Sequence, residues 1–147
     1  MSVPERLTAD ELAALVRDKD KVPGTDYVVI DVRDEDFKVG HIPGAVNVPA
    51  HEIRGATSRL LSEYGGVPTV VFHCALSQVR GPKSARIYNE AVAEALESAA
   101  GAGGGPLADQ KVYVLTGGFV AWAYRFKDTK PELVAAFDQQ LWDDETF

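Results

Sequence analysis

The residues best suited to chemistry lie in one seven-residue segment that begins at Cys74 and ends at Arg80. A cysteine thiolate is a strong nucleophile, and an arginine can grip two oxygens of a tetrahedral oxyanion through its planar guanidinium. If the segment forms a loop, its consecutive backbone N–H groups can point at the same anion. We therefore interpret Cys74 as a nucleophile toward a bound oxyanion and Arg80 as the side chain that binds its oxygens. The residues of the anion-binding loop are then Ala75, Leu76, Ser77, Gln78, Val79 and Arg80.

The residues on either side of this segment indicate how it is held. Thr69–Phe72 is an apolar run of strand length that leads into His73 and Cys74, and Gly81-Pro82 opens a stretch with apolar residues at helical spacing. Proline fits the first turn of a helix, and the positive end of the helix dipole favours an anion there. The same setting favours the thiolate form of Cys74.

A cysteine and an arginine at this spacing are weak evidence when taken alone. Lone cysteines are often small buried core residues. Eight arginines in 147 residues also place one at any given offset about once in eighteen times by chance. The predicted strand before the segment and the predicted helix after it therefore decide in favour of the nucleophile.

Strand-like and helix-like segments alternate along the chain. A capping box from Thr8 to Glu11 starts a helix that we expect to end near Lys19. Such alternation predicts an α/β fold of three layers, with a central, mainly parallel sheet and helices on both faces. Ligands of these folds bind at the carboxyl ends of strands, where Cys74 lies. The other expected elements are strands over 27–32, 46–48 and 112–115 and helices over 53–64, 82–99 and 119–126.

Composition and charge limit the function classes. The 147 residues are 46% hydrophobic, which fits one compact domain over 1–147. The formal net charge of −7 argues against nucleic acid or an anionic membrane as partner, because both require a basic surface. No apolar run reaches the length of a membrane span, and the first residues lack a signal sequence. The single cysteine allows no intrachain disulfide, so we expect a reducing compartment, cytoplasmic or nuclear.

Three polar residues near the segment have both a functional and a structural interpretation. His73 could raise the local positive potential or orient the loop, but a histidine that ends a buried strand is more often a hydrogen-bonded structural residue. Asp31 could orient Arg80 or accept a proton, or it could form an ion pair with Arg33 or bind a loop backbone. Ser77 could donate to the anion or face solvent.

The remaining polar and glycine-rich segments carry no further site. His41 and His51 are too few and too far apart in sequence to indicate a metal, so we expect neither a metal nor a bound cofactor. Gly101–Pro106 is expected to be a flexible surface loop. The acidic tail over 138–147 is expected to be partly loose, with Leu141 and Trp142 as the residues that could dock.

These features together resemble a known family. The run His73–Pro82 resembles the His-Cys-x5-Arg loop in the rhodanese-like branch that contains the cell-division-cycle dual-specificity phosphatases and the related eukaryotic arsenate reductases. Ile30–Arg33 and Gly40–Asn47 are similar to the N-terminal rhodanese signature, and Leu115–Trp122 is similar to the C-terminal one. The resemblance implies a single rhodanese-like catalytic domain, with a core over about 7–126 and a C-terminal extension over 127–147.

Within that family, loop length and loop composition carry further implications. Sulfur-transferring relatives typically have a loop one residue shorter, so the length found here implies phosphate or arsenate chemistry. The cell-cycle enzymes carry loop glutamates proposed as proton donors, where this chain has Ala75 and Val79. They also carry a second cysteine where this chain has Val32, so protection of Cys74 by an internal disulfide is excluded here.

The resemblance leaves four functions open. The first is a protein tyrosine or dual-specificity phosphatase that forms a thiophosphate on Cys74, with a phosphorylated protein or small phosphoester as substrate. The second is arsenate reduction on the same loop, with glutathione as external reductant and glutaredoxin as partner. Sulfur transfer through a Cys74 persulfide and a non-catalytic binding module are less favoured, because of the loop length and because Cys74 and Arg80 are both present.

Overall fold

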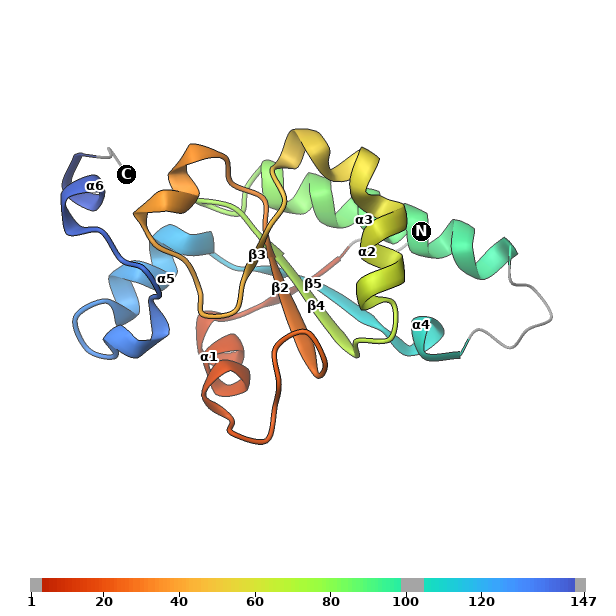
Figure 1. Cartoon of the computed structure of the whole chain (residues 1–147), viewed down its shortest axis with the longest axis horizontal. Coiled ribbons are helices and arrows are strands. Elements are labelled where there is room, and N and C mark those ends of the chain that lie inside the picture. Colours follow the sequence, from red (N-terminus) through yellow and green to blue (C-terminus); the bar gives the residue numbers. More distant parts are fainter. Residues whose placement is uncertain (1–3, 99–104, 145–147) are drawn as a thin grey trace.

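The computed structural model describes residues 4–98 and 105–144 of the 147-residue chain (Figure 1). Its strands are β1 (Glu5–Leu7), β2 (Tyr27–Asp31), β3 (Val46–Asn47), β4 (Thr69–His73) and β5 (Lys111–Leu115). Its α-helices are α1 (Ala9–Arg17), α2 (Ile53–Tyr64), α3 (Arg80–Ser98), α4 (Gly105–Asp109), α5 (Gly118–Phe126) and α6 (Gln139–Asp144). Three short 3-10 helices complete the list: η1 (Glu35–Val39), η2 (Ala50–Glu52) and η3 (Pro131–Leu133).

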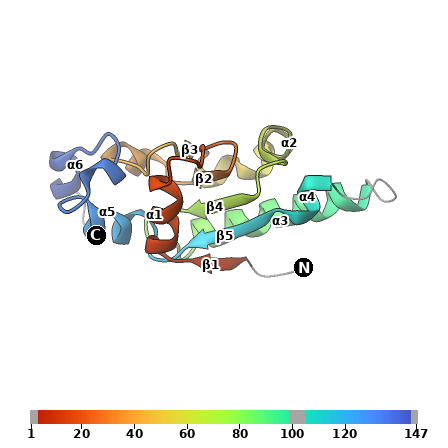
Figure 2. The ribbon, with the colours of Figure 1, turned by 90° about the horizontal axis from the view of Figure 1, so that it is seen from below.

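A five-stranded sheet forms the centre of the molecule. Its order is β1-β5-β4-β2-β3, and every neighbouring pair is parallel. Helices α1 and α5 cover one face and α2 and α3 the other (Figure 2). Because side chains alternate along a strand, Val29 of β2 packs with the first pair of helices and its neighbours Val28 and Ile30 pack with the second. The predicted three-layer α/β fold is confirmed.

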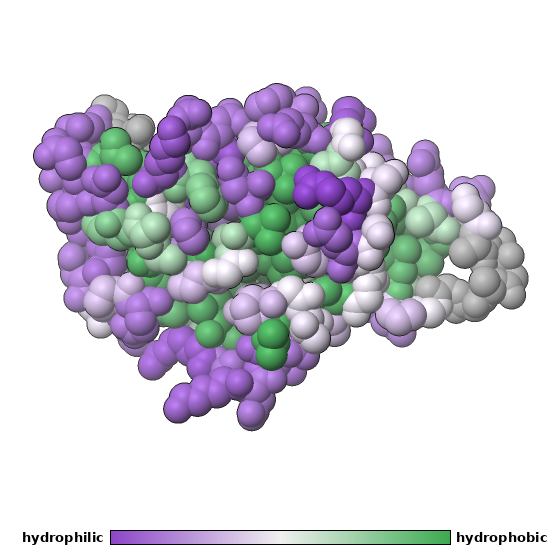
Figure 3. Space-filling view, viewed as in Figure 1, coloured by the Kyte–Doolittle hydropathy of each residue, from purple (hydrophilic) through white to green (hydrophobic). Residues whose placement is uncertain are grey.

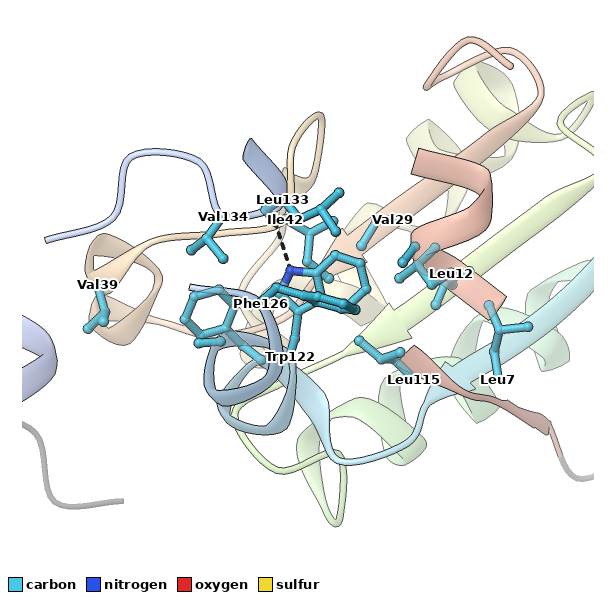
Figure 4. Close-up of a cluster of buried hydrophobic side chains, with 14 of the residues drawn as sticks. Leu7, Leu12, Val29, Val39, Ile42, Leu115, Trp122, Phe126, Leu133 and Val134 are labelled. Atoms are coloured by element: carbon cyan, nitrogen blue, oxygen red, sulfur yellow. Dashed lines mark hydrogen bonds between the residues drawn. The ribbon is translucent and has the colours of Figure 1, made fainter. Parts of the chain in front are cut away.

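The core on the α1–α5 face extends into the C-terminal segment. Trp122 of α5 is fully buried, and its indole N–H donates to the Leu133 carbonyl at 2.8 Å (Figure 4). Trp142 of α6 is also buried, with its ring centroid 5.0 Å from that of Tyr124. The expectation that Trp142 docks therefore agrees with the structure, and residues after Phe126 contribute to the same core.

Among the described strands and α-helices, three are not predicted by the sequence. Strand β1 has only three residues, and it forms because it pairs with β5 in the register Arg6↔Val114. Helix α6 forms in the tail that is expected to be partly loose. Gly105 and Pro106 belong to helix α4, so the expected loop over 101–106 is wrong at its end, while residues 101–104 lie outside the described residues.

The surface fits a chain in which a quarter of the residues are charged. Hydrophilic residues dominate the periphery of the face shown in Figure 3, and apolar residues are visible between them near its centre. Among the described residues, no helix is long and apolar enough to cross a membrane.

The topology brings several loops to one edge of the sheet. Strands β2 and β4 are paired so that their last residues, Asp31 and His73, lie opposite each other. Strand β5 lies on the other side of β4 and ends at Leu115. The segments that follow these three strands therefore meet at the carboxyl edge, where ligands bind in folds of this kind.

Candidate active site

The Cys74–Arg80 loop connects the end of β4 to the start of α3. The Sγ atom of Cys74 accepts two backbone hydrogen bonds, from the N–H groups of Ser77 at 3.2 Å and Gly81 at 3.3 Å. Cys74 is 3% exposed and belongs to the apolar cluster on the α2–α3 face. Its sulfur is nevertheless bound by polar groups, and donors of this kind stabilise negative charge on it.

Helix α5 binds the first two carbonyls of the loop from outside. The N–H of Phe119 donates to the Cys74 carbonyl at 2.9 Å, and that of Val120 donates to the Ala75 carbonyl at 3.0 Å. In a planar trans peptide the C=O and the following N–H point in opposite directions. Fixing the two carbonyls outward therefore turns the N–H groups of Ala75 and Leu76 toward the inside of the loop.

The inside of the loop is a cavity of about 190 Å³. It is large enough for a tetrahedral oxyanion with part of its substituent. Two apolar side chains on its rim are exposed to solvent, Leu76 at 50% and Val79 at 71%. The lining residues are Cys74, Ala75, Leu76, Gln78, Val79 and Arg80. Six of the seven residues predicted for the site are thus brought together around one space.

Ser77 is the member of the predicted loop that does not line the cavity. Its side chain is fully buried, so the interpretation as a solvent-facing serine is wrong. Its backbone is in the left-handed region, with φ of 55°. A left-handed residue after right-handed ones turns successive N–H groups toward a common centre, which is the geometry of an anion-binding nest.

Arg80 is bound by an acidic residue that the sequence does not single out. Its Nη2 lies 3.0 Å from Oδ2 of Asp36 in η1, and its Nη1 lies 3.5 Å from Oδ1. The hydrogen bond that Arg80 donates to the Asp36 carboxylate raises the pKa of Arg80 further above its ordinary value. The guanidinium is therefore a permanent positive charge at the cavity. The only sequence signal for Asp36 is its place after β2, whose carboxyl end faces the loop.

Asp31 and Arg33 form a fully buried ion pair with an N–O distance of 2.7 Å. This agrees with the ion-pair interpretation of Asp31, while Arg80 binds Asp36 instead. Burial opposes the charge of Asp31, but His73 and Arg33 outweigh it and hold the pKa of Asp31 below its ordinary 3.8.

The guanidinium of Arg33 also ties together the segments around the site. It donates to the carbonyls of Gly40 at 2.7 Å and Asp36 at 3.0 Å. Its central carbon lies 4.1 Å from the ring centroid of Phe119, within the range of a cation–π contact. Arg33 therefore links the segment that carries Asp36 to the first turn of α5.

The ring of His73 supports the loop by binding a backbone carbonyl of the loop. Its ring is fully buried, and burial, opposed in part by Asp31, lowers its pKa below the ordinary 6.5. The neutral ring donates through Nδ1–H to the carbonyl of Cys74 at 3.0 Å. Its Nε2 lies 3.5 Å from Oδ2 of Asp31. At neutral pH Arg33 is thus the charged partner of Asp31, and His73 is a buried ring whose hydrogen bond holds the first carbonyl of the loop.

The described residues contain no group of three or more His, Cys, Asp or Glu that could hold a metal ion. His41 stacks on Phe37 with ring centroids 4.6 Å apart. His51 is exposed and lies 3.4 Å from Asp34. Neither histidine lies in the lining of the cavity at Cys74.

Comparison with known proteins gives a consistent assignment. The sequence model of the Rhodanese-like domain matches residues 8–125. The chain is 34% identical over 104 residues to the dual specificity phosphatase ibp1 of Schizosaccharomyces pombe, covering 67% of this chain and 75% of that protein. It is 32% identical over 117 residues to arsenate reductase 2.1 of Oryza sativa subsp. japonica, covering 79% of this chain and 65% of that protein.

A solved structure of the same family also matches the chain. The yeast protein Ygr203w, described as a protein tyrosine phosphatase of the rhodanese family, superposes with a TM-score of 0.70. The two chains are 25% identical, and the match covers 97% of this chain and 99% of that one.

Gly118 allows α5 to approach the loop. We predict that Gly118→Ala disturbs the packing of α5 against the loop and destabilises the fold. A Cβ at this position would lie 2.5 Å from the carbonyl oxygens of Cys74 and Ala75, and the backbone has a φ of 60°. Overpacking and left-handed strain together should lower the free energy of unfolding by roughly 2–5 kcal/mol. Urea unfolding measures this loss. Gly55→Ala in α2 is the control, because its Cβ would meet open space and should stabilise by about 1 kcal/mol. Equal stabilities of the two variants would contradict the close approach.

Burial of His73 predicts that the fold loses stability in mild acid. Since the folded state lowers its pKa, the unfolded chain binds more protons between that pKa and 6.5. The free energy of unfolding should therefore decrease as the pH falls below about 6.5, by at most about 1.4 kcal/mol per pH unit for this group. Urea unfolding of His73→Asn should show a smaller pH slope than the wild type, whereas exposed His51→Asn should retain the wild-type slope. An unchanged slope in His73→Asn would contradict the assignment.

Asp36 competes with a bound oxyanion for Arg80, and we predict that Asp36→Asn tightens anion binding. The substitution removes a negative charge but keeps an oxygen that Arg80 can bind. Tungstate should bind about fivefold more tightly, equivalent to roughly 1 kcal/mol. Isothermal titration calorimetry measures the change. Glu35→Gln in the same 3-10 helix is the control, because Glu35 pairs with Lys38 instead. Weaker binding in Asp36→Asn would show that Asp36 orients Arg80 rather than competing for it.

Proposed function

The chain belongs to the rhodanese-like domain family, and from that premise we propose that it is a cysteine-dependent phosphatase of the protein tyrosine or dual-specificity type. One observation carries this proposal: the sulfur of Cys74 accepts two backbone N–H groups beside a cavity that Arg80 also lines. A nucleophile, converging donors and a fixed positive charge are the requirements for phosphoryl transfer through a covalent intermediate. The named relatives include phosphatases, which supports a cysteine-based enzyme.

In the proposed reaction the phosphoryl group is transferred in two steps. The Sγ of Cys74 attacks phosphorus as the bond to the leaving oxygen breaks, and the leaving alkoxide or phenoxide takes a proton. Water then attacks the thiophosphate, the S–P bond breaks, and phosphate leaves with Cys74 again a thiolate. Arg80 and the inward N–H groups bind the non-bridging oxygens throughout. The loop supplies no carboxylic acid, so aryl phosphates, whose leaving groups need less protonation, are the favoured substrates.

Arsenate reduction is a second candidate on the same loop. Arsenate is nearly isosteric with phosphate, and its reduction has no alkoxide leaving group that must be protonated. The 32% identity to a rice arsenate reductase favours it. Cys74 would form a bond to arsenic with loss of water. A glutathione thiolate then attacks Sγ, and the S–As bond breaks with its electron pair on arsenic, which leaves as arsenite and leaves Cys74 in a mixed disulfide with glutathione. A second glutathione reduces that mixed disulfide, which frees Cys74 and yields glutathione disulfide. Glutathione is thus the co-substrate and glutaredoxin the proposed partner, and no other cofactor is required.

The remaining alternatives fit the site less well. Sulfur transfer requires no cradle of this length, and a non-catalytic module has no need for Cys74 and Arg80 in the lining of one cavity. A reduced Cys74 is essential for both favoured reactions, so we propose that the protein works in a reducing compartment, the cytoplasm or the nucleus. Its proposed substrates are a phosphorylated protein or a small oxyanion.

An activity panel on wild type and Cys74→Ser tests the proposal. The wild type should hydrolyse p-nitrophenyl phosphate, and Cys74→Ser should lose about 1000-fold or more of that rate while keeping its unfolding midpoint. Equal hydrolysis by both proteins would rule out the cysteine mechanism. In the parallel assay, arsenite production should require both Cys74 and glutathione. Reduction that proceeds without added thiol would exclude the arsenate scheme, and a mass increase of one sulfur atom after thiosulfate treatment would favour sulfur transfer instead.

A further inference from the structure

A side chain from the edge of the sheet reaches the middle of the active-site loop. The Nη1 of Arg6 in β1 donates to the carbonyl of Ser77 at 2.9 Å, across 71 positions of sequence. Figure 2 shows β1 at the edge of the sheet beside β5. Arg6 is exposed as a whole, but this hydrogen bond is partly buried. An exposed edge residue thus has a specific contact with the loop.

The register of β1 fixes the direction of the Arg6 side chain. Leu7 packs in the core on the α1–α5 face. Since neighbouring residues of a strand point to opposite faces, Arg6 points to the α2–α3 face, where the loop enters α3. Its partner in β5 is Val114, which packs in the core on that same face. The bond to Ser77 is therefore a consequence of the sheet pairing.

Ser77 is the residue of the loop that most needs support. It is a serine with a left-handed backbone, a conformation that is unfavourable for residues other than glycine. Its buried hydroxyl has no hydrogen-bond partner among the described residues. The side chain of Ser77 therefore forms no hydrogen bond that could stabilise this conformation. The hydrogen bond from Arg6 to the Ser77 carbonyl stabilises it instead.

We propose that Arg6 is a positioning residue for oxyanion binding. By holding the Ser77 carbonyl outward, Arg6 turns the following N–H, that of Gln78, toward the cavity that Gln78 lines. It also keeps Ser77 in the conformation in which its own N–H reaches the sulfur of Cys74. Arg6 touches neither the substrate nor the sulfur and acts only through the backbone of the loop. The inference rests on the proposed function, because it assumes that this loop binds an oxyanion.

Tungstate is a suitable probe, since it is a tetrahedral oxyanion that cannot be turned over. Its dissociation constant is measured by isothermal titration calorimetry on the full chain, with thermal unfolding recorded in parallel. Arg6→Met removes the donor and keeps a long apolar stem, whereas Arg6→Lys keeps a charged donor. Arg86→Met is the matched control, because Arg86 is an exposed arginine of α3 and its loss changes the net charge equally.

We expect Arg6→Met to bind tungstate about tenfold more weakly than the wild type, with an unfolding midpoint close to that of the wild type. Arg6→Lys should restore binding to within about twofold, and Arg86→Met should stay within the same margin. If Arg6→Met binds like the wild type, or if Arg86→Met is weakened equally, Arg6 has no positioning role although the loop binds anions. If the wild type does not bind tungstate, the proposed function fails, and this inference with it.

Discussion

The site depends on two hydrogen bonds, by which the first turn of α5 binds the first two carbonyls of the Cys74–Arg80 loop. The N–H groups of Phe119 and Val120 hold the carbonyls of Cys74 and Ala75 outward, so the N–H groups that follow them face inward. A loop whose carbonyls faced inward would repel the same anion. The backbone of α5 comes close enough because Gly118 has no side chain in a place where a Cβ would overlap the loop.

The rest of the fold positions charged side chains beside this loop. The protein has a net charge of −7, so attraction for an anion has to be local. It comes from inward N–H groups and from Arg80, whose guanidinium lies 3.0 Å from the carboxylate of Asp36. The buried Asp31–Arg33 pair keeps its own charges balanced and connects the segment that carries Asp36 to α5. The parallel sheet makes these contacts available by bringing the ends of β2, β4 and β5 to one edge.

The loop and most of the sheet can be predicted because short stretches of sequence carry their patterns. The apolar run before Cys74 and the helical spacing after Arg80 are readable in a few residues, and β2, β4, β5, α2 and α5 agree with the expected ranges to within a residue or so. Asp36 and Arg6 are not readable in this way, since they act across 44 and 71 positions and depend on sheet register. The burial of Ser77 is also not readable locally, because it depends on how the loop packs in the folded chain.

The geometry of the site implies that the N–H groups of this loop converge on one oxyanion beside the sulfur of Cys74. The most direct measurement is the change in backbone amide ¹H–¹⁵N shifts when tungstate is titrated into the wild-type protein. We expect the amides of Ala75, Leu76 and Gln78 to shift together and with a single dissociation constant. Tungstate binding that moves amides elsewhere, and leaves those of the loop in place, would contradict it.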